Sequence, residues 1–168
     1  IAPSNVEVNE DSIAVSSETI EPDRTGNRKI EILAVHFCDE RNVHKREFRT
    51  GMPMDIVIEY KVNRPFENAV FGIGIFTSDN ICCYATNTFI DEYQILELGS
   101  RGIVKCKISN LMLIQGTYLV DVAVHHKDGE PYDYISRQYS FQVSSEIRDL
   151  GVARLEHEWE VEYQEDFK

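Results

Sequence analysis

The segment from Leu111 to Val124 limits the fold more than any other part of the chain. An apolar stretch ends at a turn containing Gly116, and Tyr118 then opens a strand in which apolar residues recur at every second position. This arrangement is typical of the penultimate strand of an immunoglobulin-like β-sandwich, where the tyrosine hydroxyl bonds to the backbone a few residues upstream. We therefore expect Tyr118 to form such a tyrosine corner.

The cysteines predict that packing alone holds this sandwich together. Disulfide-linked immunoglobulin domains carry a cysteine two residues after the tyrosine, where this chain has Val120. The four cysteines, Cys38, Cys82, Cys83 and Cys106, show no CxxC spacing, and two of them are adjacent. Because this pattern suits neither a disulfide framework nor a zinc site, we interpret all four as free thiols. Free thiols favour a recognition module in the cytoplasm.

The acidic charge of the chain is concentrated at its two ends. The net charge of the 168 residues is −12. Residues 1–23 contain six acidic residues and no Lys or Arg, and residues 156–168 contain six acidic residues against one lysine. The body between them is close to neutral, which argues against nucleic acid as a partner because phosphate backbones repel acidic chains. We expect the two ends to be solvated flanks.

No stretch of the sequence suggests a membrane span or a targeting segment. The apolar runs are too short for a transmembrane helix. We also expect no signal peptide, because no basic segment precedes an apolar run near residue 1.

From residue 28 onward, apolar residues recur with a period of two, which predicts β-strands. The expected strands are 28–37, 54–63, 71–77, 81–88, 102–109, 116–126 and 139–143. Residues 91–97 fit either a strand or a helical turn. Short strands separated by turn residues, without helical periodicity, predict one all-β domain with an immunoglobulin-like sandwich.

The two ends of the chain differ from this body. Residues 1–27 lack periodicity and are rich in Ser, Asn, Glu and Pro, which predicts a linker, with the sandwich domain spanning 28–168. Near the C-terminus, glutamates alternate with large apolar residues, which predicts a half-buried edge strand within residues 150–163. Its apolar residues include Val152, Leu155, Trp159 and Val161. They need a surface to cover, either in the same sheet or in a second copy of the chain.

Alternation also sorts the strand residues between an inner and an outer face. It directs Tyr118, Val120, Val122 and Val124 inward, and Tyr139, Phe141 and Val143 as well. It directs outward Gly72, Gly74, Phe76, Asp121, Ala123, His125, Gln138, Ser140 and Gln142. If these strands lie side by side, small residues form a floor and polar or aromatic residues form its rim. Tyr84, Asn87 and Thr88 extend this rim, and Tyr132 and Tyr134 are expected as exposed aromatic residues in a loop over 127–136.

Such a face suits an oligosaccharide. Aromatic rings stack on the apolar side of a pyranose, and carboxylates and amides bond to its hydroxyls. Each residue also has a structural alternative. Glycines on a strand mark a bulge or a packed neighbour, a loop can cap Phe76, Asp121 can be a paired carboxylate, and His125 can be solvated together with His126.

Several segments taken together resemble one family. They are Ile30 to Val35, residues 65–80, Asn87 with Thr88, Leu113 to Val124, residues 141–143, and Gly151, Leu155 and Trp159. In order and spacing, these segments resemble the C-terminal carbohydrate-binding domain of the ATPase subunit of bacterial O-antigen ABC exporters (the Wzt type), over about residues 28–160.

The resemblance carries several implications. It implies a sandwich that binds O-antigen polysaccharide in the cytoplasm, at the inner membrane, for export and lipopolysaccharide biosynthesis. It implies a homodimer that exchanges the C-terminal strand. The sequence has no GxxxxGK[ST] motif, so the ATPase domain is expected to be missing and residues 1–27 to be the end of its linker. The implied partners are that ATPase domain and the membrane subunit of the transporter.

Catalysis finds little support in the sequence. No pair of carboxylates suits a glycosidase, no Gly-x-Ser-x-Gly motif is present, and the five histidines lack metal-ligand spacing. We therefore predict no enzyme activity, no metal and no cofactor. The predicted function is recognition of O-antigen polysaccharide, with a modified chain terminus as one option. The alternative is a protein-interaction or dimerisation sandwich without a sugar ligand, and a small hydrolase ranks last.

Overall fold

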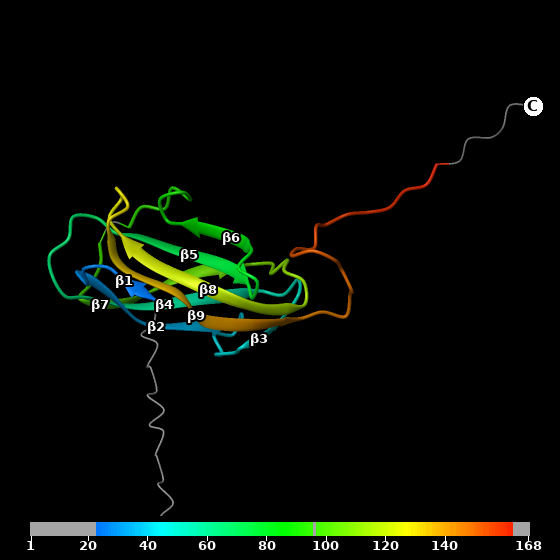
Figure 1. The fold of residues 1–168 in the computed structure, drawn as a ribbon, viewed down its shortest axis with the longest axis horizontal. Helices are drawn as coiled ribbons and strands as arrows, with labels where there is room; N and C mark the ends of the chain where they lie inside the picture. The colour runs from blue at the N-terminus through cyan, green and yellow to red at the C-terminus, as the bar shows by residue number, and fades with distance from the viewer. Residues whose placement is uncertain (1–22, 96, 163–168) are drawn as a thin grey trace, which may run out of the picture.

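The computed structural model describes residues 23–95 and 97–162, and this part of the chain forms a β-sandwich (Figure 1). Its strands are β1 (Arg24–Thr25), β2 (Ile30–Cys38), β3 (Glu47–Arg49), β4 (Met54–Val62), β5 (Val70–Thr77), β6 (Cys82–Asn87), β7 (Arg101–Ile108), β8 (Gly116–His125) and β9 (Pro131–Ser144). One sheet has the order β1-β9-β8-β5-β6, with β3 pairing to β9 in parallel, and the other has the order β2-β4-β7. The prediction of an all-β sandwich is confirmed.

Strand β8 forms the centre of the six-stranded sheet, and its alternation places its apolar side chains in the core. Tyr118, Val120, Val122 and Val124 are all buried, as predicted. The Tyr118 hydroxyl donates a hydrogen bond to the Ile114 carbonyl oxygen at 2.8 Å, so the tyrosine corner is present. Burial raises the pKa of this phenol, so the hydroxyl remains a hydrogen-bond donor further into the alkaline range.

Aromatic packing between the sheets replaces the missing disulfide. The Phe141 ring lies 5.6 Å from the Tyr118 ring in a stacked arrangement, and 5.3 Å from the Phe37 ring of the opposite sheet. Such ring pairs stabilise the folded state beyond the hydrophobic free energy gained by burying the rings. All four cysteines are free thiols, as predicted. Burial raises the pKa of the thiols of Cys38, Cys83 and Cys106.

Strand β9 is longer than the sequence predicts. The predicted segment 139–143 is only the end of a strand that begins at Pro131. Arg137 has a φ of 50°, and the pairing register with β8 shifts there. This bulge breaks the period of two, which hides the first half of the strand in the sequence. Tyr132 is therefore buried in the core, and the prediction of an exposed loop residue is wrong for it.

A buried carboxylate joins three strands at one end of the sandwich. Asp133 of β9 has an exposed fraction of 0%. Its oxygens accept hydrogen bonds from the Arg24 guanidinium at 2.9 Å and from the Ile32 backbone N–H at 2.7 Å. An Arg28 nitrogen lies 2.7 Å from the same carboxylate. The bond to Asp133 raises the pKa of Arg24. The cluster fixes β1 and β2 against β9.

The folded domain begins earlier than residue 28. Residues 24–25 form β1, and the Ser136 N–H donates to the Asp23 carbonyl at 2.9 Å. Gly26 has a φ of +123°, and a Cβ atom there would lie 2.5 Å from the Tyr132 carbonyl oxygen. Residues 23–27, which the prediction assigned to the linker, therefore belong to the sandwich, and residues 1–22 lie outside the described residues.

The C-terminal segment leaves the sandwich after a short contact. Ala153 forms an isolated β-bridge with Leu113, and the Arg154 N–H donates to the Met112 carbonyl at 2.8 Å. Residues 154–162 then extend away without strand structure (Figure 1). The prediction of an edge strand over 150–163 is therefore wrong for a single chain. Residue 163 lies outside the described residues.

Candidate functional site

The outer face of the six-stranded sheet carries a groove with a volume of about 340 Å³, which we call the sheet-face groove. Its lining residues include Gly72, Gly74, Phe76, Ala85, Asn87, Ile90, Asp121, Ala123, His125 and Tyr134. The strand register explains why they meet. Gly72 lies between Ala123 and Asn87 on the neighbouring strands, and Gly74 lies between Asp121 and Ala85.

The two glycines keep the floor of this groove low. A Cβ atom on Gly72 would lie 3.2 Å from the Asn87 Cβ, and one on Gly74 would lie 2.8 Å from the Phe76 ring. The glycines therefore make room for neighbouring side chains. Ala85 and Ala123 complete a floor of small residues.

Phe76 lies in the groove but is capped within the protein. The Arg137 guanidinium lies over the Phe76 ring, 4.4 Å from its centroid. The Arg137 Nη1 donates a hydrogen bond to the Asn80 side-chain oxygen at 2.8 Å, which holds the guanidinium in place. Arginine stacked on an aromatic ring forms a favourable cation–π contact. Phe76 is therefore capped within the protein, as the alternative to sugar stacking supposed, although by an arginine of β9 and not by a loop.

Asp121 also has an internal role. Its carboxylate accepts hydrogen bonds from the Tyr134 hydroxyl at 2.5 Å and from the Arg137 backbone N–H at 2.8 Å. Its exposed fraction is only 6%. Burial and the bond to Asp121 raise the pKa of Tyr134. The carboxylate thus holds the β9 bulge against β8, and the structure shows the paired-carboxylate alternative.

We expect Asp121→Ala to destabilise the protein without directly removing a ligand contact. The substitution leaves the Arg137 N–H and the Tyr134 hydroxyl without their acceptor, which costs about 2 kcal/mol. Urea unfolding followed by circular dichroism measures this difference. As a control, Gln142→Ala on the same outer face should change stability by less than about 0.5 kcal/mol. Unchanged stability of Asp121→Ala would contradict the internal role.

The remaining groove side chains come from β6, β8, β9 and the turn after β6. The Asn87 side-chain oxygen accepts a bond from the Ile90 N–H at 2.8 Å, which fixes the turn and brings the exposed Ile90 over the groove. His125 lies in the groove with Nδ1 2.7 Å from the His126 carbonyl oxygen. Sequence reasoning missed Ile90 because no strand periodicity extends into this turn.

Five residues predicted for this face or its rim lie outside the sheet-face groove. Tyr84 is opposite Ile75, which points into the core, so Tyr84 lies on the other face of β6. Gln138 and Ser140 line a different groove, at the side of the sandwich. Gln142 is exposed on the outer face but lines neither groove. Thr88 uses its hydroxyl to accept a bond from the Phe71 N–H at 3.2 Å.

Comparison with known proteins identifies the family. The model of the Wzt C-terminal domain family matches residues 21–155. The chain belongs to the Wzt C-terminal domain family. A crystal structure of the C-terminal domain of wzt has the same fold, with a TM-score of 0.75 and 21% identity over 84% of this chain and 89% of the other. The soluble domain of PmoD from Methylocystis sp. ATCC 49242 (Rockwell) matches with a TM-score of 0.32 and 14% identity, over 71% of this chain and 94% of the other. No curated protein matches the sequence significantly.

Family membership makes this chain a domain of an O-antigen export transporter. It corresponds to the non-catalytic C-terminal domain of an ABC transporter subunit, whose ATPase is a different domain. Within residues 23–95 and 97–162, no helix has the length and apolar character needed to cross a membrane.

Proposed function

We propose that this domain binds O-antigen polysaccharide for export, and that the sheet-face groove is its glycan site. The observation that carries the proposal is the low floor of Gly72, Gly74, Ala85 and Ala123 beside Tyr134. A volume of about 340 Å³ lies at the small end of the range for ligand pockets. A low floor lets a flat pyranose ring approach the sheet closely.

The chemistry of the rim also supports a saccharide ligand. The Tyr134 ring and the Ile90 side chain offer apolar surface for the face of a sugar ring. The Asn87 side-chain nitrogen has no hydrogen-bond partner among the described residues and offers a donor to sugar hydroxyls. Phe76 and Asp121, which are occupied inside the protein, shape this site from beneath.

Filling the groove tests the proposal. We expect Ala85→Trp to weaken binding of the host's purified O-polysaccharide at least about tenfold, because the indole would occupy the floor. Calorimetry or NMR titration of the 168-residue chain measures the affinity, with an unrelated polysaccharide as a negative control. Tyr84→Trp is the matched control, since it adds bulk on the adjacent residue of the same strand but on the opposite face.

The possible outcomes separate the site from the function. If Ala85→Trp binds as tightly as the wild type, the glycan site lies elsewhere on the domain. If the wild-type chain binds neither polysaccharide at millimolar concentrations, carbohydrate recognition is wrong. In that case the alternative, a protein-interaction module, is favoured.

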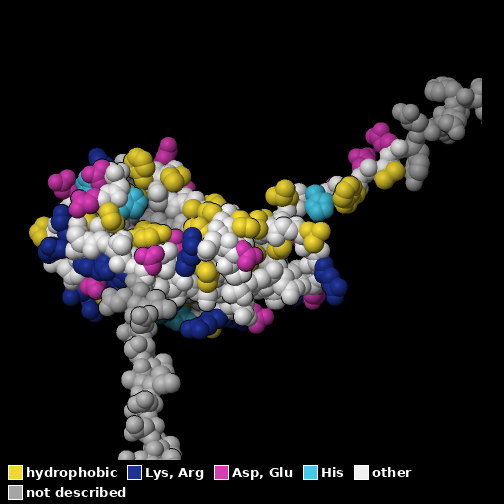
Figure 2. Space-filling view, viewed as in Figure 1, with side chains coloured by type: hydrophobic (Ala, Val, Ile, Leu, Met, Phe, Trp, Pro, Cys, Tyr) yellow, Lys and Arg dark blue, Asp and Glu magenta, His cyan; other side chains and the backbone are white. Residues whose placement is uncertain are grey.

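The C-terminal tail supports a second role, self-association. Leu155, Trp159 and Val161 have exposed fractions of 77%, 91% and 71%. Figure 2 shows hydrophobic and acidic side chains along the extended tail. Large apolar side chains in a row are seldom left in water unless a partner covers them. We infer that a second copy of the chain covers the tail, in a homodimer that exchanges this segment.

Strand β7 is a suitable acceptor for the partner's tail. It pairs only with β4 among the described strands, so its other edge has free backbone groups. Arg101, Lys105 and Lys107 alternate along its outer face. A tail strand added here would place its glutamates beside these basic residues and Trp159 over the opening between the sheets.

This role is compatible with the other proposed partners of the domain. They are the ATPase domain and the membrane subunit of the transporter, on the cytoplasmic side of the inner membrane.

A further inference from the structure

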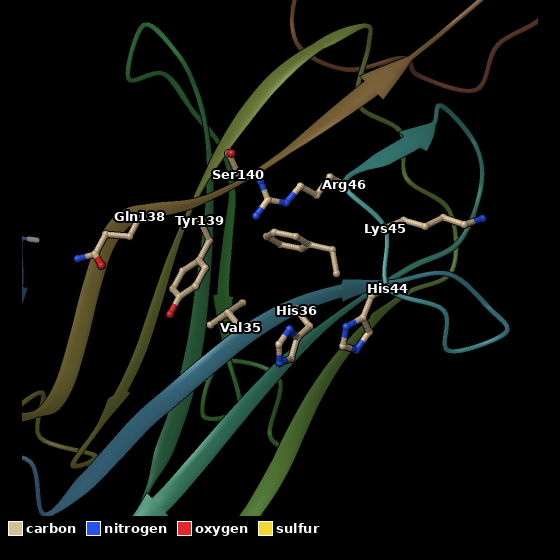
Figure 3. Close-up of a pocket in the computed structure, with 9 residues that line it drawn as sticks. Val35, His36, His44, Lys45, Arg46, Gln138, Tyr139 and Ser140 are labelled. Carbon is tan, nitrogen blue, oxygen red and sulfur yellow. The ribbon is translucent and has the colours of Figure 1, made fainter.

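A second groove, with a volume of about 440 Å³, lies on the side of the sandwich, between β2 of one sheet and β9 of the other (Figure 3). Its lining is Val35, His36 and Phe37 of β2, His44, Lys45 and Arg46 before β3, and Gln138, Tyr139 and Ser140 of β9. We call it the side groove. None of its residues lines the sheet-face groove.

The side groove is built at an open edge of β9. Strand β9 pairs with β1 at Tyr134 and Ile135, and with β3 from Gln142 onward. The Gln142 N–H points to this edge, since it donates to the Arg46 carbonyl at 2.7 Å. Backbone N–H groups along a strand alternate between its two edges, so the Ser140 N–H points the same way. It therefore faces the groove, between β1 and β3.

Arg46 brings a positive charge into this groove. Figure 3 shows its guanidinium reaching toward Ser140 and Tyr139, while Lys45 extends away from them. Lys45 pairs with Asp39 at 2.6 Å, whereas no carboxylate of the described residues lies within 4.0 Å of the Arg46 guanidinium. The body of the chain between its acidic ends is close to neutral, so an arginine without a nearby carboxylate makes this groove locally positive and attractive to anions.

Two histidines lie beside Arg46. The His36 and His44 rings are stacked with their centroids 4.4 Å apart. His36 Nε2 lies 3.0 Å from the Glu59 carboxylate, which orients its ring. The loop that carries His44 is held by Asp39, and the hydrogen bond from Lys45 lowers the pKa of that carboxyl group. Asp39 therefore stays ionised further into the acid range and continues to hold the loop there.

We propose that the side groove binds a carboxylate or phosphate group, with Arg46 as its charged contact and the Ser140 N–H and hydroxyl as neutral donors. The planar guanidinium can donate two parallel hydrogen bonds to two oxygens of such a group. Gln138 and the Ser140 carbonyl provide partners for neighbouring hydroxyls. The ligand class is thus an acidic or phosphate-substituted saccharide. The inference that the ligand is a saccharide rests on the proposed function, whereas the inference that it carries an anionic group does not.

NMR titration of the ¹⁵N-labelled 168-residue chain tests this site. The probes are oligogalacturonate, glucose 6-phosphate, neutral maltose and inorganic phosphate. We expect saturable shifts of the Ser140 and Arg46 amide signals with at least one of the two acidic saccharides. Arg46→Gln should weaken that binding about tenfold or more. Arg41→Gln, which removes the same charge from the same loop but outside the groove, should bind as the wild type does.

The remaining outcomes are equally informative. Equal shifts with maltose, unchanged affinity of Arg46→Gln, or no shift with either acidic saccharide would overturn the site. If inorganic phosphate binds as tightly as glucose 6-phosphate, the anion site stands and its saccharide part is overturned. None of these results depends on Ala85, so a failure here is distinguishable from a failure of the sheet-face groove.

Discussion

Asp133→Ala is expected to lower the free energy of unfolding by about 3 kcal/mol. The carboxylate is fully buried and bonds to Arg24, Arg28 and the Ile32 N–H. Removing it leaves a buried N–H unsatisfied, deprives the Arg28 guanidinium of its counter-charge, and leaves Arg24 with only the more distant Glu31 carboxylate at 4.0 Å. The side chains of Arg24 and Arg28 are 25% and 34% exposed, so water partly rehydrates them. For that reason we expect the lower end of the range for broken buried ion pairs.

Urea unfolding followed by circular dichroism measures this loss, and two further variants define its origin. Asp133→Asn keeps an acceptor for the Ile32 N–H but removes the charge, so its loss of stability should be smaller. Asp79→Ala removes an exposed carboxylate in the turn after β5 and should change stability by less than about 0.5 kcal/mol. Asp133→Ala within that same margin would show that β1 and β2 dock without the cluster.

Removal of residues 155–168 is expected to convert a dimer into a folded monomer. Up to Arg154 the tail contacts its own sandwich, while Leu155 and Trp159 are highly exposed. Their deletion should therefore leave the unfolding midpoint of the isolated sandwich nearly unchanged. Light scattering after size exclusion should give about twice the chain mass of 19.4 kDa for the whole chain, and a single truncated chain for the variant.

Trp159 provides a direct optical check, because it is the only tryptophan in the sequence. Its side chain is 91% exposed in the single chain, so a monomer should emit like an indole in water. Dimerisation that buries the ring should shift the emission to shorter wavelength as the protein concentration rises. Emission that stays solvent-like at every concentration would sink the exchange of this segment.

The acceptor strand is tested by charge reversal on the outer face of β7. Lys107→Glu places a negative charge where the partner's glutamates would lie, and should raise the dimer dissociation constant. Lys61→Glu is the control, because it reverses a charge on β4, opposite Arg101 and one strand further from the free edge of β7 than Lys107. Equal dissociation constants for both variants would move the acceptor to another edge.

The fold was predictable wherever local alternation persists. The inward series that begins at Tyr118 follows directly from the strand period of two, and the hydroxyl bond to Ile114 follows from the turn before it. Strands β1 and β3 were not predictable, because two or three residues carry no detectable period. They exist because β9 provides an edge, and Arg137 concealed half of β9 by breaking its alternation.

The candidate site divides in a similar way. Alternation alone brought Gly72, Gly74 and Ala123 to one face, and the structure places them side by side. It gave no sign that Arg137 would cap Phe76, since that contact depends on a bulge in a distant strand. The face of Tyr84 was also misjudged, because the pairing register of β6 with β5 decides it.

The fold class and the inner and outer faces of the long strands follow from the amino-acid sequence alone, because both depend on backbone geometry within a few residues. Which outward groups remain free for a ligand depends on how the strands pack in the folded domain. Asp121 and Phe76 are occupied by Arg137. Arg46, in contrast, faces an open strand edge, and no carboxylate of the described residues lies within 4.0 Å of its guanidinium. These differences arise from contacts between residues far apart in the chain, which no local pattern records.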